Sequence, residues 1–236
     1  MRRMFALEAT VFRKYIRQLL LSVLFVSFFL IMGMESIIGL PTMTSIMLML
    51  TIVSSSAGYD EQNNWQAYRL LMPLRRRDVV AGRYAFVLVT ALSILMLLIV
   101  VCLGVSALGR VVALPGILND IVLKSADDLL EFAASTVAGI CLGVTFASLS
   151  LPVFFKFGQT KATQWLPVAM ICIVILPFFA FSSYADALAV WLLPVLEFAG
   201  NPLGLAIVMC ASLGIVAAFY IVSAFASIRL YEERDL

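Results

Sequence analysis

The run YAFVLVTALSILMLLIVVCLGVSAL occupies Tyr84–Leu108 and contains no Asp, Glu, Lys or Arg. A helix needs roughly 20 mostly apolar residues to cross a hydrocarbon core of about 30 Å, and this run is long enough. It is apolar on every side, which excludes the alternating pattern of a transmembrane β-strand. Because a helix satisfies its own backbone hydrogen bonds inside lipid, the run predicts a transmembrane helix.

The rest of the chain has the same character. It is 63% hydrophobic and only 13% charged over 236 residues, which excludes a soluble globular domain. We therefore predict an all-α integral membrane protein that forms a single transmembrane domain over residues 1–236. Its six expected transmembrane helices cover residues 19–38, 42–58, 84–108, 129–153, 165–181 and 203–228.

The distribution of cations predicts the orientation of the chain. All but two of the sixteen Lys and Arg residues fall on one side of these spans, the exceptions being Arg110 and Lys124. Short loops rich in Lys and Arg stay in the cytoplasm. We therefore expect both termini and the segment Tyr59–Arg83 on the cytoplasmic face of the membrane. The net charge of +2 reports this orientation and predicts no nucleic-acid partner.

Two segments outside the spans are expected to lie at the surfaces of the lipid bilayer. Residues 1–18 predict an amphipathic helix in the interface, with its basic side chains against anionic headgroups. This helix is either a simple anchor or an elbow helix that touches a cytoplasmic partner. On the outer side, residues 182–202 predict short re-entrant helices before the last span.

The long cytoplasmic loop reads DEQNNWQAYRLLMPLRRRDVVAGRY over residues 60–84. Asp60 and Glu61 suit the first turn of a helix, because their negative charge complements the exposed N–H groups there. An apolar stripe follows at helical spacing, formed by Trp65, Tyr68, Leu71 and Met72, before Pro73 ends the helix. Two interpretations stay open: a helix that docks onto a partner protein, or a passive basic loop that lies on the headgroups.

This loop resembles the first cytoplasmic loop of ABC type-2 transporter permeases, the membrane-spanning subunits of ABC exporters. That loop follows the pattern LP-x-x-R-x-x-[IV][IV]-x-x-[KR]-[YF], in which Arg83 stands here where Lys is frequent. A second match, LPVFFKFG at Leu151–Gly158, is similar to the P-x-x-F-K-F-G element of the same family. The six-span plan with cytoplasmic ends is similar over the whole chain. The resemblance therefore implies a bacterial plasma (inner) membrane.

The resemblance implies that the first loop forms a coupling helix seated on an ABC ATPase subunit. Carried onto this sequence, it implies contact by Asp60, Glu61, Trp65, Tyr68 and Arg69, with Leu71, Met72, Arg75 and Arg76 close by. The second cytoplasmic loop contributes Phe155, Lys156, Phe157 and Gly158. The resemblance also implies a second membrane subunit, either identical in a homodimer or a related paralogue. It identifies no substrate-binding residue.

The chain lacks the groups that catalysis of its own would need. It contains no phosphate-binding G-x-x-x-x-G-K-[ST] motif and no histidine. We therefore expect that it is not an enzyme and that it binds no cofactor or metal. The resemblance places ATP and Mg on the partner ATPase.

The leading interpretation is a permease subunit that exports an amphipathic or hydrophobic substrate, such as a peptide, an antibiotic or a lipid-like molecule. A non-transporting membrane scaffold or regulator of an ATPase would share the docking helix and stays an alternative. An ion-coupled secondary transporter is less favoured, because it would need ionisable side chains at mid-membrane depth. An intramembrane enzyme would need clustered catalytic side chains, which the spans lack.

Overall fold

The computed structural model describes residues 2–34, 36–62, 75–111, 123, 125–183, 190, 193–195 and 197–232, with the backbone alone at 2, 3, 14, 32, 34, 60–62, 110, 111 and 159–183. The described residues form helices and no strand, which confirms the all-α class. The main helices are α1 (Arg2–Met34), α2 (Leu40–Gln62), α4 (Arg76–Val111), α6 (Ala126–Ser183) and α8 (Pro202–Glu232).

Four of these helices contain a segment that is long and apolar enough to cross a membrane. The segments are Leu40–Tyr59, Arg76–Gly109, Ala126–Gly158 and Pro202–Glu232. Helix α1 supplies a fifth if its two parts, Met4–Arg13 and Tyr15–Ile31, count as one span across a bend of 64°. The sixth expected span, over residues 165–181, falls in the part of α6 whose side chains are outside the described structure. The described residues therefore support four or five spans.

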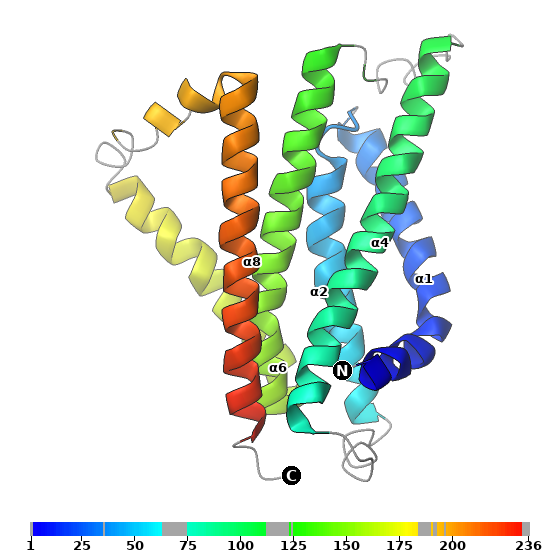
Figure 1. The fold of residues 1–236 in the computed structure, drawn as a ribbon, viewed down its shortest axis with the longest axis vertical. Coiled ribbons are helices and arrows are strands. Elements are labelled where there is room, and N and C mark those ends of the chain that lie inside the picture. The colour runs from blue at the N-terminus through cyan, green and yellow to red at the C-terminus, as the bar shows by residue number, and fades with distance from the viewer. Residues whose placement is uncertain are drawn as a thin grey trace.

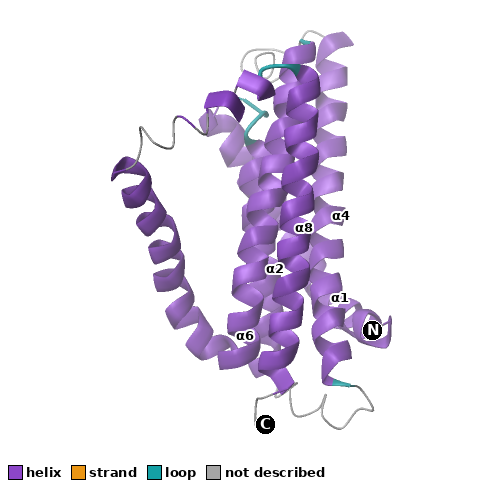
Figure 2. Ribbon diagram, turned by 60° about the vertical axis from the view of Figure 1, so that its left-hand side comes forward, coloured by secondary structure: helices purple, strands orange, loops and turns teal. Residues whose placement is uncertain are grey.

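The helices form an elongated bundle (Figure 1). Helix α6 packs on α2 and on α8, while α4 contacts α1, α2 and α8. At Gly158 the path of α6 breaks, because its φ of 77° lies in the left-handed region that favours glycine. Beyond this break the second half of α6 points away from the bundle (Figure 2). We call the end of the bundle that holds this break, the start of α4 and the end of α8 the basal end.

The first part of α1 packs against α4. Met4 and Phe12 are almost fully buried. The ring of Phe12 lies edge to face on Phe86 of α4, with the centroids 5.2 Å apart. Gly82 permits this approach, because a Cβ atom there would lie 2.7 Å from Cγ of Met4.

The expected position of residues 1–18 in the bilayer interface stays a prediction, and their packing on α4 is compatible with it. The apolar arc of the helix faces protein, because the side chains of α4 offer it a drier surface than lipid headgroups. Contact of this segment with a cytoplasmic partner, as in an elbow helix, stays a prediction.

Helices α2 and α6 approach each other closely at two glycines. A Cβ atom at Gly139 would lie 2.6 Å from Cα of Thr42, and one at Gly143 would lie 3.0 Å from the backbone oxygen of Ser45. Thr42 also donates its hydroxyl to the backbone oxygen of Ser135 at 2.7 Å. Small residues at a spacing of four commonly bring membrane helices together, and Gly139 and Gly143 have this spacing.

We expect Gly139→Ala to lower the melting temperature of the protein purified in detergent. The added methyl group would overlap the backbone of α2, and such overpacking costs about 1–3 kcal/mol. Gly104→Ala is the matched control, because nothing lies within 4 Å of its added Cβ and alanine favours a helix. Equal shifts of Tm for the two variants would contradict the close contact of α2 with α6.

Candidate functional site

The basal end of the bundle holds polar and aromatic side chains that connect four helices. We call this group the basal cluster; it consists of Glu8, Arg76, Arg83, Tyr84, Phe155, Tyr220, Ser223, Ser227 and Tyr231. The loop after α2 leads into α4 within this cluster, and the break in α6 lies beside it. The end of the first predicted docking loop and the start of the second therefore meet at this cluster.

A buried ion pair joins α1 to α4 in this cluster. Arg83 donates to Oε1 of Glu8 from Nη2 at 2.8 Å and from Nε at 3.3 Å. The two side chains are only 6% and 5% exposed. The guanidinium group also lies 5.8 Å from the ring centroid of Phe155, at the break in α6. Arg83 thus connects three helices from one position.

Hydroxyl groups join α4 to α8. The hydroxyl of Tyr84 shares hydrogen bonds with Ser223 at 2.8 Å and with Ser227 at 2.6 Å. Tyr220 donates its hydroxyl to the backbone oxygen of Tyr84 at 2.9 Å. Ser223 in turn donates to the backbone oxygen of Ser148 on α6. These bonds hold α4, α6 and α8 in one register.

Two arginine side chains at the start of α4 contact the last turn of α8. Arg76 donates from Nη1 to the backbone oxygens of Tyr231 at 3.3 Å and of Glu232 at 2.8 Å. Such donors satisfy carbonyl groups that the helix end leaves open. Arg77 forms an exposed ion pair with the Glu232 carboxylate at 2.9 Å.

The family comparison agrees with this architecture. Residues 5–232 match the family model described as ABC-2 family transporter protein. The chain belongs to this family. Neither the curated proteins nor the solved structures contain a significant match to it. The ABC-2 match and the long apolar helices make the chain a multi-pass membrane component of a transport system.

The structure of this ABC-2 family protein places part of the first predicted docking loop. Asp60 and Glu61 were expected in the first turn of a new helix. They lie instead in the last turn of α2. The reason is that no proline interrupts α2 after Tyr59, so its hydrogen-bonded backbone continues to Gln62. The remaining predicted contacts before Pro73 are outside the described residues; they are Trp65, Tyr68, Arg69, Leu71 and Met72.

Arg75 and Arg76 are the two arginines among these predicted contacts that the structure describes, and they differ in role. Arg75 is exposed, and its backbone oxygen accepts bonds from the N–H groups of Asp78 at 2.9 Å and Val79 at 3.3 Å. It therefore caps the start of α4. Arg76 points across to α8, as described above. Arg75 therefore presents its side chain outward, whereas Arg76 is held against α8.

The second predicted docking loop divides into an inward and an outward part. Phe155 is buried and meets the ring of Tyr231 at a centroid distance of 5.4 Å. Lys156 and Phe157 are exposed, and the Lys156 ammonium group lies 5.4 Å from the centroid of the Phe157 ring. Gly158 supplies the break in α6. Arg76 and Phe155, one from each loop, therefore converge on the same residue of α8, Tyr231.

Sequence reasoning missed the ion pair at the centre of this arrangement. Glu8 is the only acidic residue in the first 34 residues. It lies four residues after Met4 and four before Phe12, on the apolar arc of the helix. An isolated carboxylate on an apolar arc is the signal that predicts a buried cationic partner.

We expect Glu8→Ala to destabilise the protein strongly. It would leave the buried guanidinium of Arg83 without the Glu8 carboxylate, and breaking a buried ion pair costs about 3–5 kcal/mol. The measurement is thermal unfolding in detergent, with Arg77→Ala as the control. Arg77 is 73% exposed in its ion pair, so its loss should change Tm little. Similar losses of stability in both variants would show that burial of the Glu8–Arg83 pair is not decisive.

Proposed function

We propose that this chain is the membrane-spanning permease subunit of an ABC exporter and that a separate ATPase subunit hydrolyses the ATP. The family match supports a permease. The observation that carries the rest is the convergence of Arg76 and Phe155 on Tyr231. Because of this convergence, a force applied to either docking loop reaches α4, α6 and α8 together.

The proposal places the basal end in the cytoplasm of a bacterium. Exposed cations gather there, as Arg75, Arg77 and Lys156. The start of α6, at the other end of the bundle, carries the exposed acids Asp127 and Glu131. Basic segments remain on the cytoplasmic side during insertion, so this asymmetry favours cytoplasmic termini in the plasma membrane.

In the proposed mechanism, nucleotide-dependent closure of two ATPase subunits pushes the docking segment between the end of α2 at Gln62 and Pro73. The basal cluster passes this displacement to α4, the first half of α6 and α8 as one unit. The break at Gly158 leaves the second half of α6 free to follow a different path. A second membrane subunit, identical or related, completes the transport pathway. The cargo is amphipathic or hydrophobic, since the described spans present mainly apolar side chains.

Cysteine labelling tests the orientation. In a variant whose four native cysteines are replaced by alanine, Asn64→Cys should react with a membrane-impermeant maleimide only after the cells are permeabilised. Asn119→Cys should react in intact cells, because it lies in the opposite loop. The reverse pattern would overturn the cytoplasmic assignment of the basal end and the docking mechanism with it.

A double variant tests the docking. We expect Trp65→Ala combined with Arg69→Glu to weaken binding of the ATPase subunit at least tenfold, since aromatic and arginine residues dominate protein interfaces. Trp191→Ala combined with Lys124→Glu likewise removes one indole ring and reverses one positive charge, in loops of the opposite side, and should bind normally. Quantitative pull-down gives the affinity, and membrane fractionation confirms insertion.

Wild-type binding by the first double variant would remove the docking assignment. The ATPase activity of the reconstituted complex separates a permease from a mere scaffold. A permease should show ATPase activity that rises with cargo, whereas a scaffold should show none that depends on cargo.

A further inference from the structure

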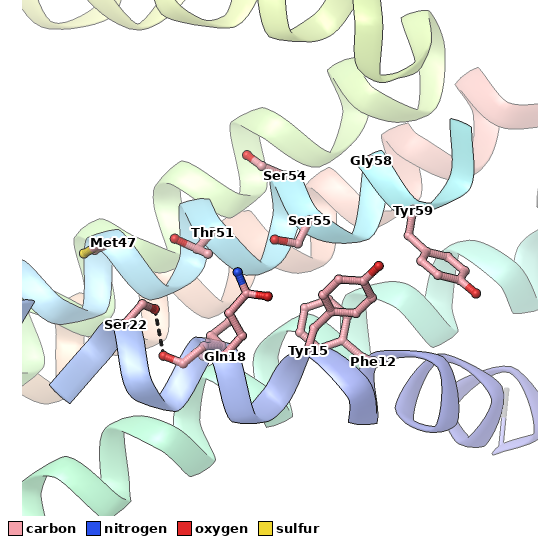
Figure 3. Close-up of a pocket in the computed structure, with 11 residues that line it drawn as sticks. Phe12, Tyr15, Gln18, Ser22, Met47, Thr51, Ser54, Ser55, Gly58 and Tyr59 are labelled. Atoms are coloured by element: carbon pink, nitrogen blue, oxygen red, sulfur yellow. Dashed lines mark hydrogen bonds between the residues drawn. The ribbon is translucent and has the colours of Figure 1, made fainter. Parts of the chain in front are cut away.

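A groove of about 510 Å³ separates α1 from α2 on the basal side of the bundle. Its walls come from α1 between Phe12 and Ser22 and from α2 between Met47 and Tyr59 (Figure 3). The volume is within the range of roughly 300–1,000 Å³ that small-molecule sites occupy. The α2 wall lies inside a candidate transmembrane segment, so the groove opens beside the hydrocarbon region.

Three polar side chains that line the groove are Gln18, Thr51 and Ser55. Gln18 reaches from α1 toward α2, where Thr51 and Ser55 occupy the facing wall (Figure 3). None of these three side chains forms a hydrogen bond with any residue that the structure describes. Serine and threonine in a helix commonly bond to a carbonyl of the preceding turn, as Ser22 and Ser56 do here. Thr51 and Ser55 instead keep their hydroxyls available to the groove.

Apolar and aromatic side chains also line the groove. Leu19 is buried in the α1 wall and Met47 is exposed on the α2 wall. Tyr15 and Tyr59 meet edge to face at the basal end, with ring centroids 6.1 Å apart, and so connect the two helices. None of the described lining residues is an acid or a basic residue. A charged group would therefore enter without a counter-charge, which is costly beside a hydrocarbon region.

We propose that this groove binds an uncharged amphipathic molecule. Its hydroxyl- or amide-bearing head bonds to Gln18, Thr51 and Ser55, and its alkyl chain lies against Leu19 and Met47. The head needs both donors and acceptors, since the amide of Gln18 and the two hydroxyls supply both kinds of group. Identification of this ligand as the exported cargo rests on the proposed function; the binding site itself does not.

Photo-crosslinking tests the site on the full-length chain in proteoliposomes, without any ATPase. The probe is a monoacylglycerol that carries a diazirine in its acyl chain, and its matched controls are the fatty acid and the alkylamine of equal length. We expect the neutral probe to label peptides within residues 12–22 and 47–59 at least tenfold more than either charged probe. Equal labelling by all three probes would overturn the proposed selectivity.

Side-chain variants test the hydrogen bonds. Gln18→Leu combined with Thr51→Val and Ser55→Ala should reduce labelling about tenfold or more, because three neutral hydrogen bonds are lost. The control combines Ser93→Ala with Thr145→Val, whose hydroxyls bond to their own helices and do not line the groove. Unchanged labelling of a folded triple variant would overturn the site.

Two other occupants are distinguishable by the same experiment. Uniform labelling of all exposed apolar faces would indicate surrounding lipid and would overturn the proposal. An absence of label on both walls would indicate that a second copy of the chain covers them, and it would overturn the proposal as well. Specific labelling by a probe that fails to stimulate the reconstituted ATPase would retain the site and reject its role in cargo binding.

Discussion

Burial of the Arg83 guanidinium is the constraint on which the basal end depends. An uncompensated charge buried in an apolar bundle costs several kcal/mol. The Glu8 carboxylate offsets this cost for the buried guanidinium of Arg83. The bond of 2.8 Å between them ties the start of the chain to α4. Through the contact of Arg83 with Phe155, the same guanidinium reaches the break in α6. One charged group thus places three segments that are distant in sequence.

Hydrogen bonds between buried polar groups set the register of α8. In lipid, the hydrophobic effect gives little preference for one helix face over another, so close packing and hydrogen bonds decide which faces meet. Ser223 and Ser227 lie one turn apart and both bond to the hydroxyl of Tyr84. Rotation of α8 by one residue would move both serines away from it. The tyrosine therefore selects one packing among many that are equally apolar.

The sequence was a good guide to the helices and a poor guide to their partners. The uncharged run of Tyr84–Leu108 is sufficient to predict a helix, because the requirement is local to the segment. The position of Asp60 was mispredicted since a rule for helix starts was applied where α2 had not yet ended. Glu8 was missed because its partner lies 75 residues away. The contacts of Arg76 and Phe155 with Tyr231 depend on tertiary packing, and so does the groove between α1 and α2. The spacing of residues along the sequence does not predict such packing.

The basal cluster and the groove both contain polar side chains between apolar helices, but among the described residues these side chains are hydrogen-bonded to one another only in the cluster. In the cluster, polar groups bond to one another, and the requirements of folding account for them. In the groove, Gln18 and the hydroxyls facing it bond to no described residue, so packing alone does not account for their presence beside a hydrocarbon region. The proposed ligand would account for them, because it would form hydrogen bonds with these side chains. Helix α1 carries Glu8 before its bend and Gln18 after it. Phe12 lines the groove and lies one turn after Glu8 on the same part of α1, so a displacement that parts the ion pair also moves this end of the groove.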